Sequence, residues 1–512
     1  MGSCSAQKAG VVAAVLLAGC PTYPDAPEVE PPVPGWQSAD TAEAPPCDPV
    51  DWNGDFDWPL SDAELCAGDY TVRIRGDLRL WAGTESVAGL SCVCEVEGDL
   101  MMEHLYALDS LKGLERLQRV DGDLRITAAL GLRTLDGLSS LRSVGAALSI
   151  SSNQRLESLS GLKRVEQAGE LFVTDNAELV TLGGLERLES VSGELYITGN
   201  RRLSSLRGLD TLREVGGIIY LSANGRLATL SGLNALEHVG GLQVWYHSSL
   251  IRFDGLKSLA TVDGDIIIRS NTRLEACKLP ALEQVGGELN ILDNLGPIVS
   301  PSLDRLTSIG GILFINNNPA MRYIVGLDAL TDVRDIQISS NDSLESVEGL
   351  GAVTSVNSVY IVGNDLLTSF DALGALNQVD DIMHFRENRL ESIDGFGSLR
   401  QIGSLDLDDA RLTNVRWARG LERIDRDLLF IENGGLESLD GLEDLREVGQ
   451  DVVLSENTSL TDLRGLYGLE RIGNDLRITD NNALSQAEID ALLDTIGEGN
   501  VGGAISVSSN GD

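Results

Sequence analysis

Two stretches of the chain, VSGELYITGN (Val191–Asn200) and VGGIIYLSAN (Val215–Asn224), repeat one pattern 24 residues apart. Both keep a valine, a glycine, two aliphatic residues in alternation and a closing asparagine, while the residues between the stretches change freely. Sixteen intervals separate position 105 from position 481, a mean repeat of about 23.5 residues. The closing asparagines are Asn153, Asn176, Asn200, Asn224, Asn271, Asn294, Asn318, Asn341, Asn364, Asn388, Asn433, Asn457 and Asn481. So regular a period indicates a repeat architecture.

The asparagine position has four substitutes, Leu105, Ala129, His247 and Ala410. We expect each asparagine to point inward at a corner of the chain, where its amide satisfies backbone groups that no strand pairs. This predicts a structural role rather than a catalytic one. It also predicts local weakness at Ala129 and Ala410, where the amide is missing.

Within each repeat, the consensus V-G-G-x-L-x-I-x-x-N-x-x-L-x-S-L-x-G-L-x-x-L-x-x has two apolar periods. Alternation such as Leu195, Tyr196, Ile197 predicts a short strand whose first and third side chains face inward. Leucines at every third position, such as Leu203 and Leu206, predict short extended pieces, and no repeat has room for a long helix. Each repeat therefore predicts one turn of a solenoid whose apolar residues are covered by the turns on either side.

Glycine precedes many of the expected strands and gives way to Asn357, Asp381 and Asn474 in later repeats. Because these residue types tolerate positive φ best, we expect a left-handed corner at this position. The glycines are Gly169, Gly193, Gly217, Gly240, Gly264, Gly287 and Gly311.

The repeat resembles the leucine-rich repeat, and more closely the receptor L-domain, whose turns carry L-x-I-x-x-N followed by x-x-L-x-x-L-x-G-L. The resemblance covers residues 98–484 and also fits a class of bacterial lipoproteins. It implies a mainly β, single elongated right-handed β-helix-like solenoid of about 16–18 turns, used for binding. At about 4.8 Å per stacked strand, sixteen turns extend for roughly 80 Å. Receptor L-domains have far fewer turns, so no ligand contact is carried over.

The N-terminus has the pattern of a secretory signal, with Lys8 followed by the apolar stretch 9–19. Leu17, Ala18, Gly19 and Cys20 resemble the bacterial lipobox, which implies a lipoprotein signal peptide at 1–19 and lipid (diacylglycerol or palmitate) on Cys20. An ordinary secretory signal cleaved nearby is the alternative. The proline-rich residues 20–46 then predict an extended stalk between lipid anchor and solenoid.

Both ends of the solenoid need lids over their apolar edges. Residues 47–97 are expected to form an N-terminal cap, in which Cys47, Cys66, Cys92 and Cys94 make two disulfides whose pairing the sequence leaves open. Residues 485–512 are expected to form a C-terminal cap of one helix, begun by Ser485, and one strand. Cys277 replaces a core leucine and is interpreted as a small buried hydrophobe.

The net charge of −39 disfavours nucleic acid as a partner. The four histidines, His104, His238, His247 and His384, lie in different repeats, and no catalytic or phosphate-binding motif is found, so we expect no enzyme, cofactor or metal. The segment Asp51–Asp62 alternates acidic residues like a calcium loop, but its glycine is misplaced and its last acidic residue is Asp rather than Glu. A solvated acidic turn is the better interpretation.

The outward position between the two inward aliphatic residues of each strand is unusually aromatic. Five candidate ligand-binding residues occupy this position, Phe172, Tyr196, Tyr220, Phe314 and Tyr360. Two more candidates, Trp245 and Tyr246, lie beside the outward residue Gln243. Two residues before the outward position runs an acidic column, Asp99, Asp123, Glu170, Glu194, Asp265, Glu288, Asp335, Asp427, Asp451 and Asp475. Exposed aromatic residues are typical anchors for proteins or glycans, although stacking across strands explains them without any ligand.

Together these features predict a monomeric lipoprotein of the bacterial envelope, at the outer membrane or cell surface. Its membrane contact is the lipid on Cys20, and its sheet face is expected to bind a surface protein or a glycan. The alternative is a passive envelope spacer without a specific ligand.

Overall fold

The computed structural model describes residues 47–59, 65–298, 303–393 and 396–511. The described residues all belong to one compact unit, Pro46–Asp512. The predicted signal peptide, Cys20 and the stalk lie outside the described residues. No helix in the described part of the chain is long and apolar enough to cross a membrane.

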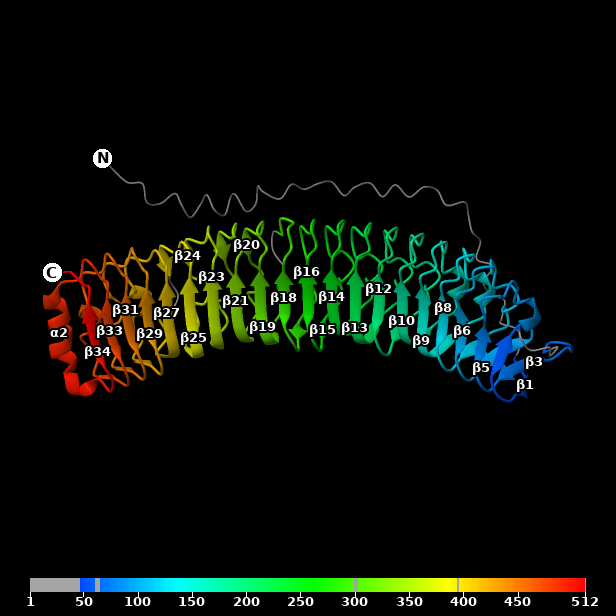
Figure 1. Cartoon of the computed structure of the whole chain (residues 1–512), viewed down its shortest axis with the longest axis horizontal. Coiled ribbons are helices and arrows are strands. Elements are labelled where there is room, and N and C mark those ends of the chain that lie inside the picture. The colour runs from blue at the N-terminus through cyan, green and yellow to red at the C-terminus, as the bar shows by residue number, and fades with distance from the viewer. Residues whose placement is uncertain (1–46, 60–64, 299–302, 394–395, 512) are drawn as a thin grey trace, which may run out of the picture. The chain divides into compact units, whose positions relative to one another are not determined.

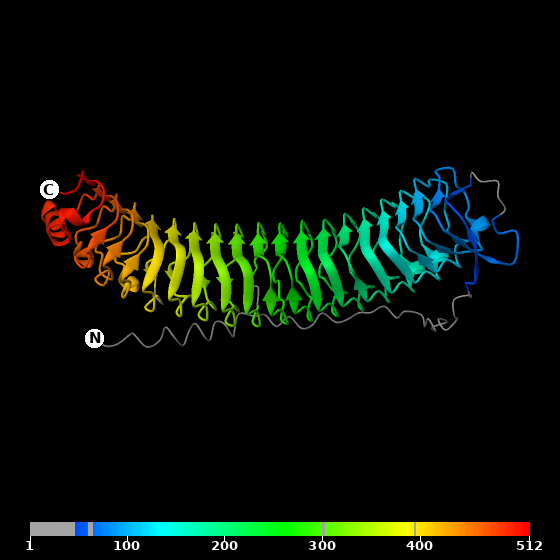
Figure 2. The same ribbon diagram turned by 90° about the horizontal axis from the view of Figure 1, so that it is seen from below.

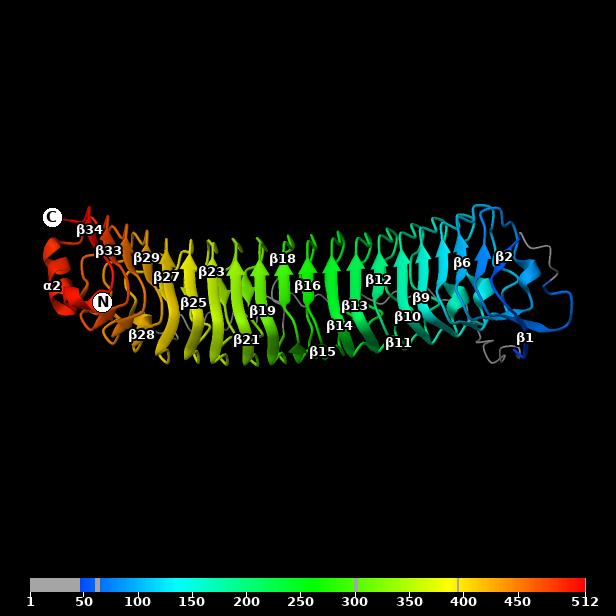
Figure 3. The same ribbon diagram turned by 60° about the horizontal axis from the view of Figure 1, so that its bottom comes forward.

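The described residues form a parallel β-solenoid of about 18 turns, which confirms the predicted fold class. Successive turns place their strands side by side in chain order, from β1 to the C-terminal helix α2 (Figure 1). Figures 2 and 3 show the same succession from two further sides. Thirty strands join one sheet, and two pairs of short strands form separate two-stranded sheets.

Each turn has two strand segments, a short first arm and a main arm. They meet at the corner where many turns carry glycine. In nine turns, one strand runs through this corner: β9 (Ser143–Ser151), β10 (Gln167–Thr174), β13 (Glu214–Ser222), β14 (His238–Trp245), β19 (Ser308–Asn316), β21 (Asp332–Ser339), β23 (Ser355–Val362), β25 (Gln378–Arg386) and β27 (Gln401–Asp408). Separate first arms are β1 (Pro49–Trp52), β3 (Thr71–Ile74), β5 (Val93–Val96), β7 (Arg119–Val120), β11 (Ser190–Val191), β15 (Thr261–Val262), β17 (Gln284–Val285), β28 (Arg423–Ile424), β30 (Glu447–Val448) and β32 (Arg471–Ile472).

The remaining main arms are β2 (Phe56–Trp58), β4 (Leu78–Leu80), β6 (Leu100–Glu103), β8 (Leu124–Thr127), β12 (Leu195–Thr198), β16 (Ile266–Arg269), β18 (Leu289–Leu292), β29 (Leu428–Ile431), β31 (Val452–Ser455), β33 (Leu476–Thr479) and β34 (Ile505–Ser508). The two-stranded sheets are made by β20 (Tyr323–Ile324), β22 (Ser346–Val347), β24 (Ser369–Phe370) and β26 (Ser392–Ile393). Short 3-10 helices are η1 (Ala88–Leu90), η2 (Asp136–Leu138), η3 (Ser160–Leu162), η4 (Arg416–Ala418), η5 (Arg464–Leu466) and η6 (Glu498–Asn500), and the α-helix is α2 (Gln486–Ile496).

The apolar pattern of the sequence maps directly onto the core. In β12, Leu195 and Ile197 are buried, and Tyr196 and Thr198 between and after them are half-buried. The leucines at every third position, such as Leu203 and Leu206, have no exposed surface. A fully buried leucine contributes roughly 1.5–3 kcal/mol, so the turns are held together mainly by the side chains that they share with their neighbours.

The closing asparagines form a buried ladder, as predicted. The Oδ1 atom of Asn318 accepts a hydrogen bond from the backbone N–H of Asn294 at 3.1 Å, and its Nδ2 donates to the carbonyl of Ile291 at 2.9 Å. Each ladder asparagine thus joins its own turn to the preceding one through both ends of its amide. Asn510 extends the ladder past Asn481, a position that the sequence analysis missed because the C-terminal helix interrupts the period.

The substitutes break this ladder in different ways. The backbone N–H groups of Ala129 and Ala410 donate to Asn153 and Asn433 of the following turns, but a methyl group offers nothing to the preceding turn. The weakness expected at these two turns stays a prediction. His247 is fully buried, and neither of its ring nitrogens has a hydrogen-bond partner.

The left-handed corner that we expected at the glycines is wrong. None of Gly169, Gly193, Gly217, Gly240, Gly264, Gly287 and Gly311, nor Asn357, Asp381 or Asn474, has a positive φ. The glycines are needed for space, since a Cβ at Gly240 would lie 2.5 Å from the carbonyl oxygen of Gly216 in the preceding turn. Positive φ occurs instead just before the ladder asparagine, as at Asp175 (55°) and Ala223 (53°).

The two ends carry the expected disulfides and helix. The bridges are Cys47–Cys94 and Cys66–Cys92, and β1 and β2 pair in parallel with β3 and β4, so the cysteine-containing segment belongs to the same sheet. At the C-terminal end, Ser485 caps α2, which buries Ile489, Leu492 and Ile496. Cys277 is a buried free cysteine, as interpreted.

Candidate functional site

Three of the candidate aromatic residues form a file of rings on the sheet face. Phe172 on β10, Tyr196 on β12 and Tyr220 on β13 are partners in the parallel register. The Phe172 and Tyr196 ring centroids are 4.9 Å apart with planes 15° from parallel, and those of Tyr196 and Tyr220 are 4.2 Å apart at 11°. The parallel register imposes this stacking, because it repeats the same outward position at each strand.

Trp245 and Tyr246 extend the file at its C-terminal end. The Trp245 ring lies 6.5 Å from that of Tyr220, and the Tyr246 ring lies 6.3 Å from that of Trp245, both in stacked orientation. Tyr246 occupies the positive-φ corner, at 57°, and its side chain is 57% exposed. We name Phe172, Tyr196, Tyr220, Trp245 and Tyr246 the aromatic strip.

The other two candidates, Phe314 and Tyr360, do not join the aromatic strip. Gln243, Ile267 and Asn290 occupy the outward position between Tyr220 and Phe314. Tyr360 instead contacts His384, with ring centroids 5.8 Å apart. Five of the seven candidates therefore form one continuous row of rings, and Phe314 and Tyr360 lie apart from it.

The acidic column is largely a second ladder of hydrogen bonds. The Oδ1 atoms of Asp99, Asp265 and Asp451 each accept from the backbone N–H of the equivalent residue in the next turn, at 2.8–3.0 Å. This structural role explains why aspartate recurs there, which the sequence analysis did not anticipate. The recurrence of carboxylates at a spacing of one turn was the sequence signal from which this ladder could have been predicted.

Glu170 and Glu194 depart from this ladder. The backbone of Glu170 pairs with β9, but its carboxylate makes no ion pair or hydrogen bond with another described residue. Burial raises the pKa of Tyr196, and interaction with the Glu194 carboxylate and the Tyr220 hydroxyl raises it further. The glutamates therefore place negative charge beside the aromatic strip, whereas the aspartates of the column accept hydrogen bonds from the backbone.

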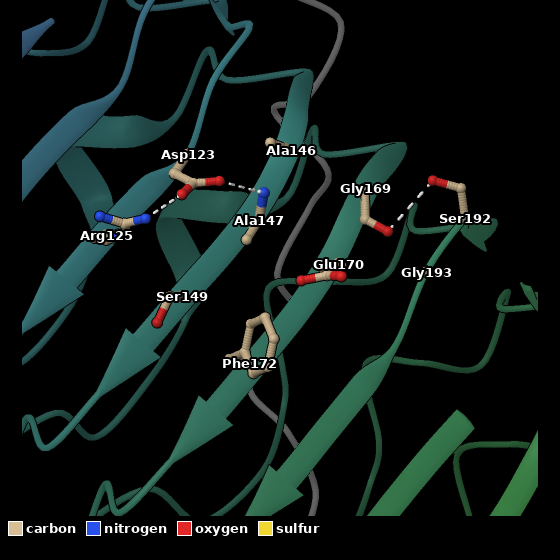
Figure 4. Close-up of a pocket in the computed structure, with 10 residues that line it drawn as sticks. All are labelled: Asp123, Arg125, Ala146, Ala147, Ser149, Gly169, Glu170, Phe172, Ser192 and Gly193. Atoms are coloured by element: carbon tan, nitrogen blue, oxygen red, sulfur yellow. Dashed lines mark hydrogen bonds and ion pairs between the residues drawn. The ribbon is translucent and has the colours of Figure 1, made fainter. Parts of the chain in front are cut away.

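An open depression adjoins the aromatic strip at Phe172 (Figure 4). It has a volume of about 690 Å³ and is lined by Asp123, Arg125, Ala146, Ala147, Ser149, Gly169, Glu170, Phe172, Ser192 and Gly193. The small side chains of Ala147 and Ser149 on β9 form its floor, between the Asp123–Arg125 ion pair and the pair Glu170 and Phe172. Three of these residues, Asp123, Glu170 and Phe172, belong to the two columns expected from the sequence, but the depression itself was not predicted.

The structure also pairs His384, one of the four histidines found in different repeats, with Asp406 of the next turn. Nδ1 of His384 lies 2.6 Å from Oδ2 of Asp406, and both side chains are mostly buried. They occupy the same outward position in adjacent turns, which was the signal that could have paired them. Burial raises the pKa of the nearby Asp408, which lies 3.2 Å from Arg386.

The acidic segment Asp51–Asp62 is engaged by arginines at its described carboxylates. Asp51 pairs with Arg75 at 2.6 Å and Asp55 with Arg79 at 2.9 Å, and hydrogen bonds lower the pKa of both carboxyl groups. Asp62 lies outside the described residues. Among the residues described, no group of three or more His, Cys, Asp or Glu side chains could hold a metal ion.

No family model matches the chain, and no curated protein matches it. Among solved structures, the Toll–Spatzle complex of Drosophila, described as a molecular hub in development and innate immunity, is similar to it. The TM-score is 0.35 and the identity 15%, and the match covers 85% of this chain and 63% of that chain. The chain thus spans less than two thirds of that structure, and at these values the similarity assigns it neither a ligand nor a partner.

Proposed function

We propose that the chain is a non-enzymatic binding protein, lipid-anchored through Cys20 in a bacterial envelope, which recognises a surface protein or a glycan through the aromatic strip. The observation that carries the binding function is the file of stacked rings on one sheet face. Aromatic side chains with polar neighbours supply large contact areas at low entropic cost and dominate many recognition surfaces.

The proposed anchoring and location depend on the N-terminal sequence. Leu17, Ala18 and Gly19 before Cys20 favour lipid attachment, and the proline-rich stretch that follows favours a stalk. The two disulfides support export, because disulfides form and persist in oxidising compartments. Destination at the outer membrane or cell surface is the finer part of the proposal.

A passive spacer is the competing function, and one observation favours it. The rings of Tyr196 and Tyr220 already stack at 4.2 Å, and such pairs stabilise a sheet by a few tenths to about 1 kcal/mol without a ligand. The spacer function predicts that the aromatic strip contributes to stability alone.

A pull-down from envelope extract and a glycan array separate the two functions. The triple variant Tyr196→Ala, Tyr220→Ala, Trp245→Ala should lose a partner that the unmodified protein retains. The matched control Phe314→Ala, Tyr360→Ala removes two rings outside the aromatic strip and should retain it. Unchanged binding by a folded triple variant would show that the aromatic strip is only structural, and an unmodified protein that retains no partner or glycan would favour the spacer. Separately, Cys20→Ser should abolish incorporation of labelled palmitate.

A further inference from the structure

The aromatic strip ends abruptly at Phe172. One face of the Phe172 ring stacks on Tyr196, while on its other side the register partner is Ser149, whose hydroxymethyl group is far smaller than a ring. The open depression lies on this side (Figure 4). The outer face of the terminal ring therefore borders an accessible space, whereas the inner rings cover one another.

This space has the dimensions of one further ring. Arg125, Ser149 and Phe172 are successive partners across β8, β9 and β10. Strands lie about 4.8 Å apart, so the backbones of Arg125 and Phe172 are roughly 9.6 Å apart. A ring stacked on Phe172 as closely as Tyr196 is, at 4.9 Å, would stand over Ser149, midway between them.

The walls favour an aromatic ring with a hydrogen-bond donor. The carboxylate of Glu170, beside Phe172, pairs with no other described side chain, so it is free to accept a hydrogen bond. Arg125 on the far side keeps its ion pair with Asp123, and a guanidinium group attracts the face of an aromatic ring. Two carboxylates against one guanidinium leave the depression negative, like the whole chain.

The next turn holds the arrangement that such a ligand would copy. Tyr196 stacks on Phe172, and its hydroxyl interacts with Glu194, which lies two residues earlier, just before β12 begins. Glu170 has the same relation to Phe172, but phenylalanine has no hydroxyl to offer it. A tyrosine in the space over Ser149 would supply both the missing ring and the missing donor.

We propose that the depression between Arg125 and Phe172 is a binding slot for one aromatic side chain, tyrosine above all, presented by a basic segment of a protein partner. The slot rests on the proposed function and narrows it to a protein ligand. The basic flanks follow from the net charge of −39, which attracts cationic segments and repels acidic ones.

Fluorescence anisotropy with labelled pentapeptides tests the slot on the full-length protein. Lys-Lys-Tyr-Lys-Lys should bind at least fivefold more tightly than Lys-Lys-Leu-Lys-Lys, and Lys-Lys-Phe-Lys-Lys should lie between them. Ser149→Phe fills the slot with a ring of the chain itself, so it should remove the preference for tyrosine without lowering Tm. The control Val453→Phe adds a ring at the same strand position in a remote turn, β31, and should leave the preference intact. Glu170→Gln should equalise the tyrosine and phenylalanine peptides.

Equal binding of the tyrosine and leucine peptides would overturn the slot. Saccharide binding that Ser149→Phe abolishes, without any preference among the peptides, would also overturn it, in favour of a glycan site. If Ser149→Phe retains the native envelope partner while the triple variant of the aromatic strip loses it, the slot is wrong and the proposed function stands. If both variants retain the partner, both proposals fail.

Discussion

Replacing His247 by asparagine should stabilise the solenoid, and more strongly in acid. Burial lowers the pKa of His247 to about 4 from the ordinary 6.5, although the Trp245 backbone and the Asn271 side chain oppose this in part. The ring stands in the ladder position, yet the contacts of its nitrogens with these two groups do not reach hydrogen-bond geometry. Asparagine there restores two bonds to the preceding turn, like those made by Asn224 to Asn200 and Ile197.

The magnitude has two parts. Two buried hydrogen bonds contribute about 2 kcal/mol, and the smaller side chain costs about 1 kcal/mol through the space that it leaves, a net gain of about 1 kcal/mol at pH 7.5. Because the folded pKa lies below the unfolded value, the unfolded chain binds more protons between pH 6.5 and pH 4, and the wild-type protein loses stability as the pH falls through that window. The loss is about 2 kcal/mol at pH 5, so the total advantage of His247→Asn there is about 3 kcal/mol.

Hydrogen exchange read by mass spectrometry is the suitable assay, because long repeat arrays need not unfold in one step. Amides of β13 and β14 should exchange more slowly in His247→Asn, and the difference from wild type should widen from pH 7.5 to pH 5 after correction for intrinsic exchange rates. His238→Asn, which replaces a partly exposed histidine on β14, should not reproduce this gain. An equal difference at both pH values, or a destabilised variant, would refute a neutral histidine buried in the ladder.

Four further predictions concern the ladder, the cysteines and the C-terminal helix. Asn318→Ala should cost about 3 kcal/mol, measured as a lower midpoint in urea, whereas the exposed Asn234→Ala should change stability by less than about 0.5 kcal/mol. Reduction of Cys47–Cys94 and Cys66–Cys92 should destabilise the first turns by about 2–4 kcal/mol and speed exchange in β1 to β5 but not in β23, because each turn contacts only its neighbours. Cys277 is 1% exposed, and burial raises its pKa to about 12. In a chain that begins at residue 47 it should resist Ellman's reagent and react only once the protein is denatured. Reaction in the native state would contradict its burial. Leu492→Ala should cost about 2–5 kcal/mol and loosen β33 and β34, seen as faster exchange there.

The sequence predicted the parts of the structure that depend on a repeated pattern. A polar amide such as Asn200, recurring among buried aliphatic residues, has few roles other than bonding the backbone, so the ladder followed from spacing alone. The alternation in Leu195–Ile197 likewise determined which side chains face inward. The disulfides could be expected from composition, but their pairing required the positions of the strands.

What the sequence did not predict depends on the distance between neighbouring turns. The role of Gly240 was misjudged because a crowded position and a positive φ both favour glycine in a sequence. The crowding arises in the folded chain, where a Cβ at Gly240 would lie 2.5 Å from the carbonyl oxygen of Gly216. The depression beside Phe172 was missed because it arises from what Ser149 lacks. A small residue in an outward column carries no signal until its neighbours on both sides are known.

Disulfide trapping of paired cysteines tests most directly whether each repeat is one turn of a single continuous stack. Leu429 on β29 and Val453 on β31 are register partners, as are Val453 and Arg477 on β33. Cysteines at Leu429 and Val453 should therefore oxidise to a bridge, since adjacent strands are about 4.8 Å apart. Cysteines at Leu429 and Arg477, two turns apart at roughly 9.6 Å, exceed the reach of a disulfide. The first pair should therefore form a bridge and the second should not; an unbridged first pair, or a bridged second pair, would contradict a single continuous stack.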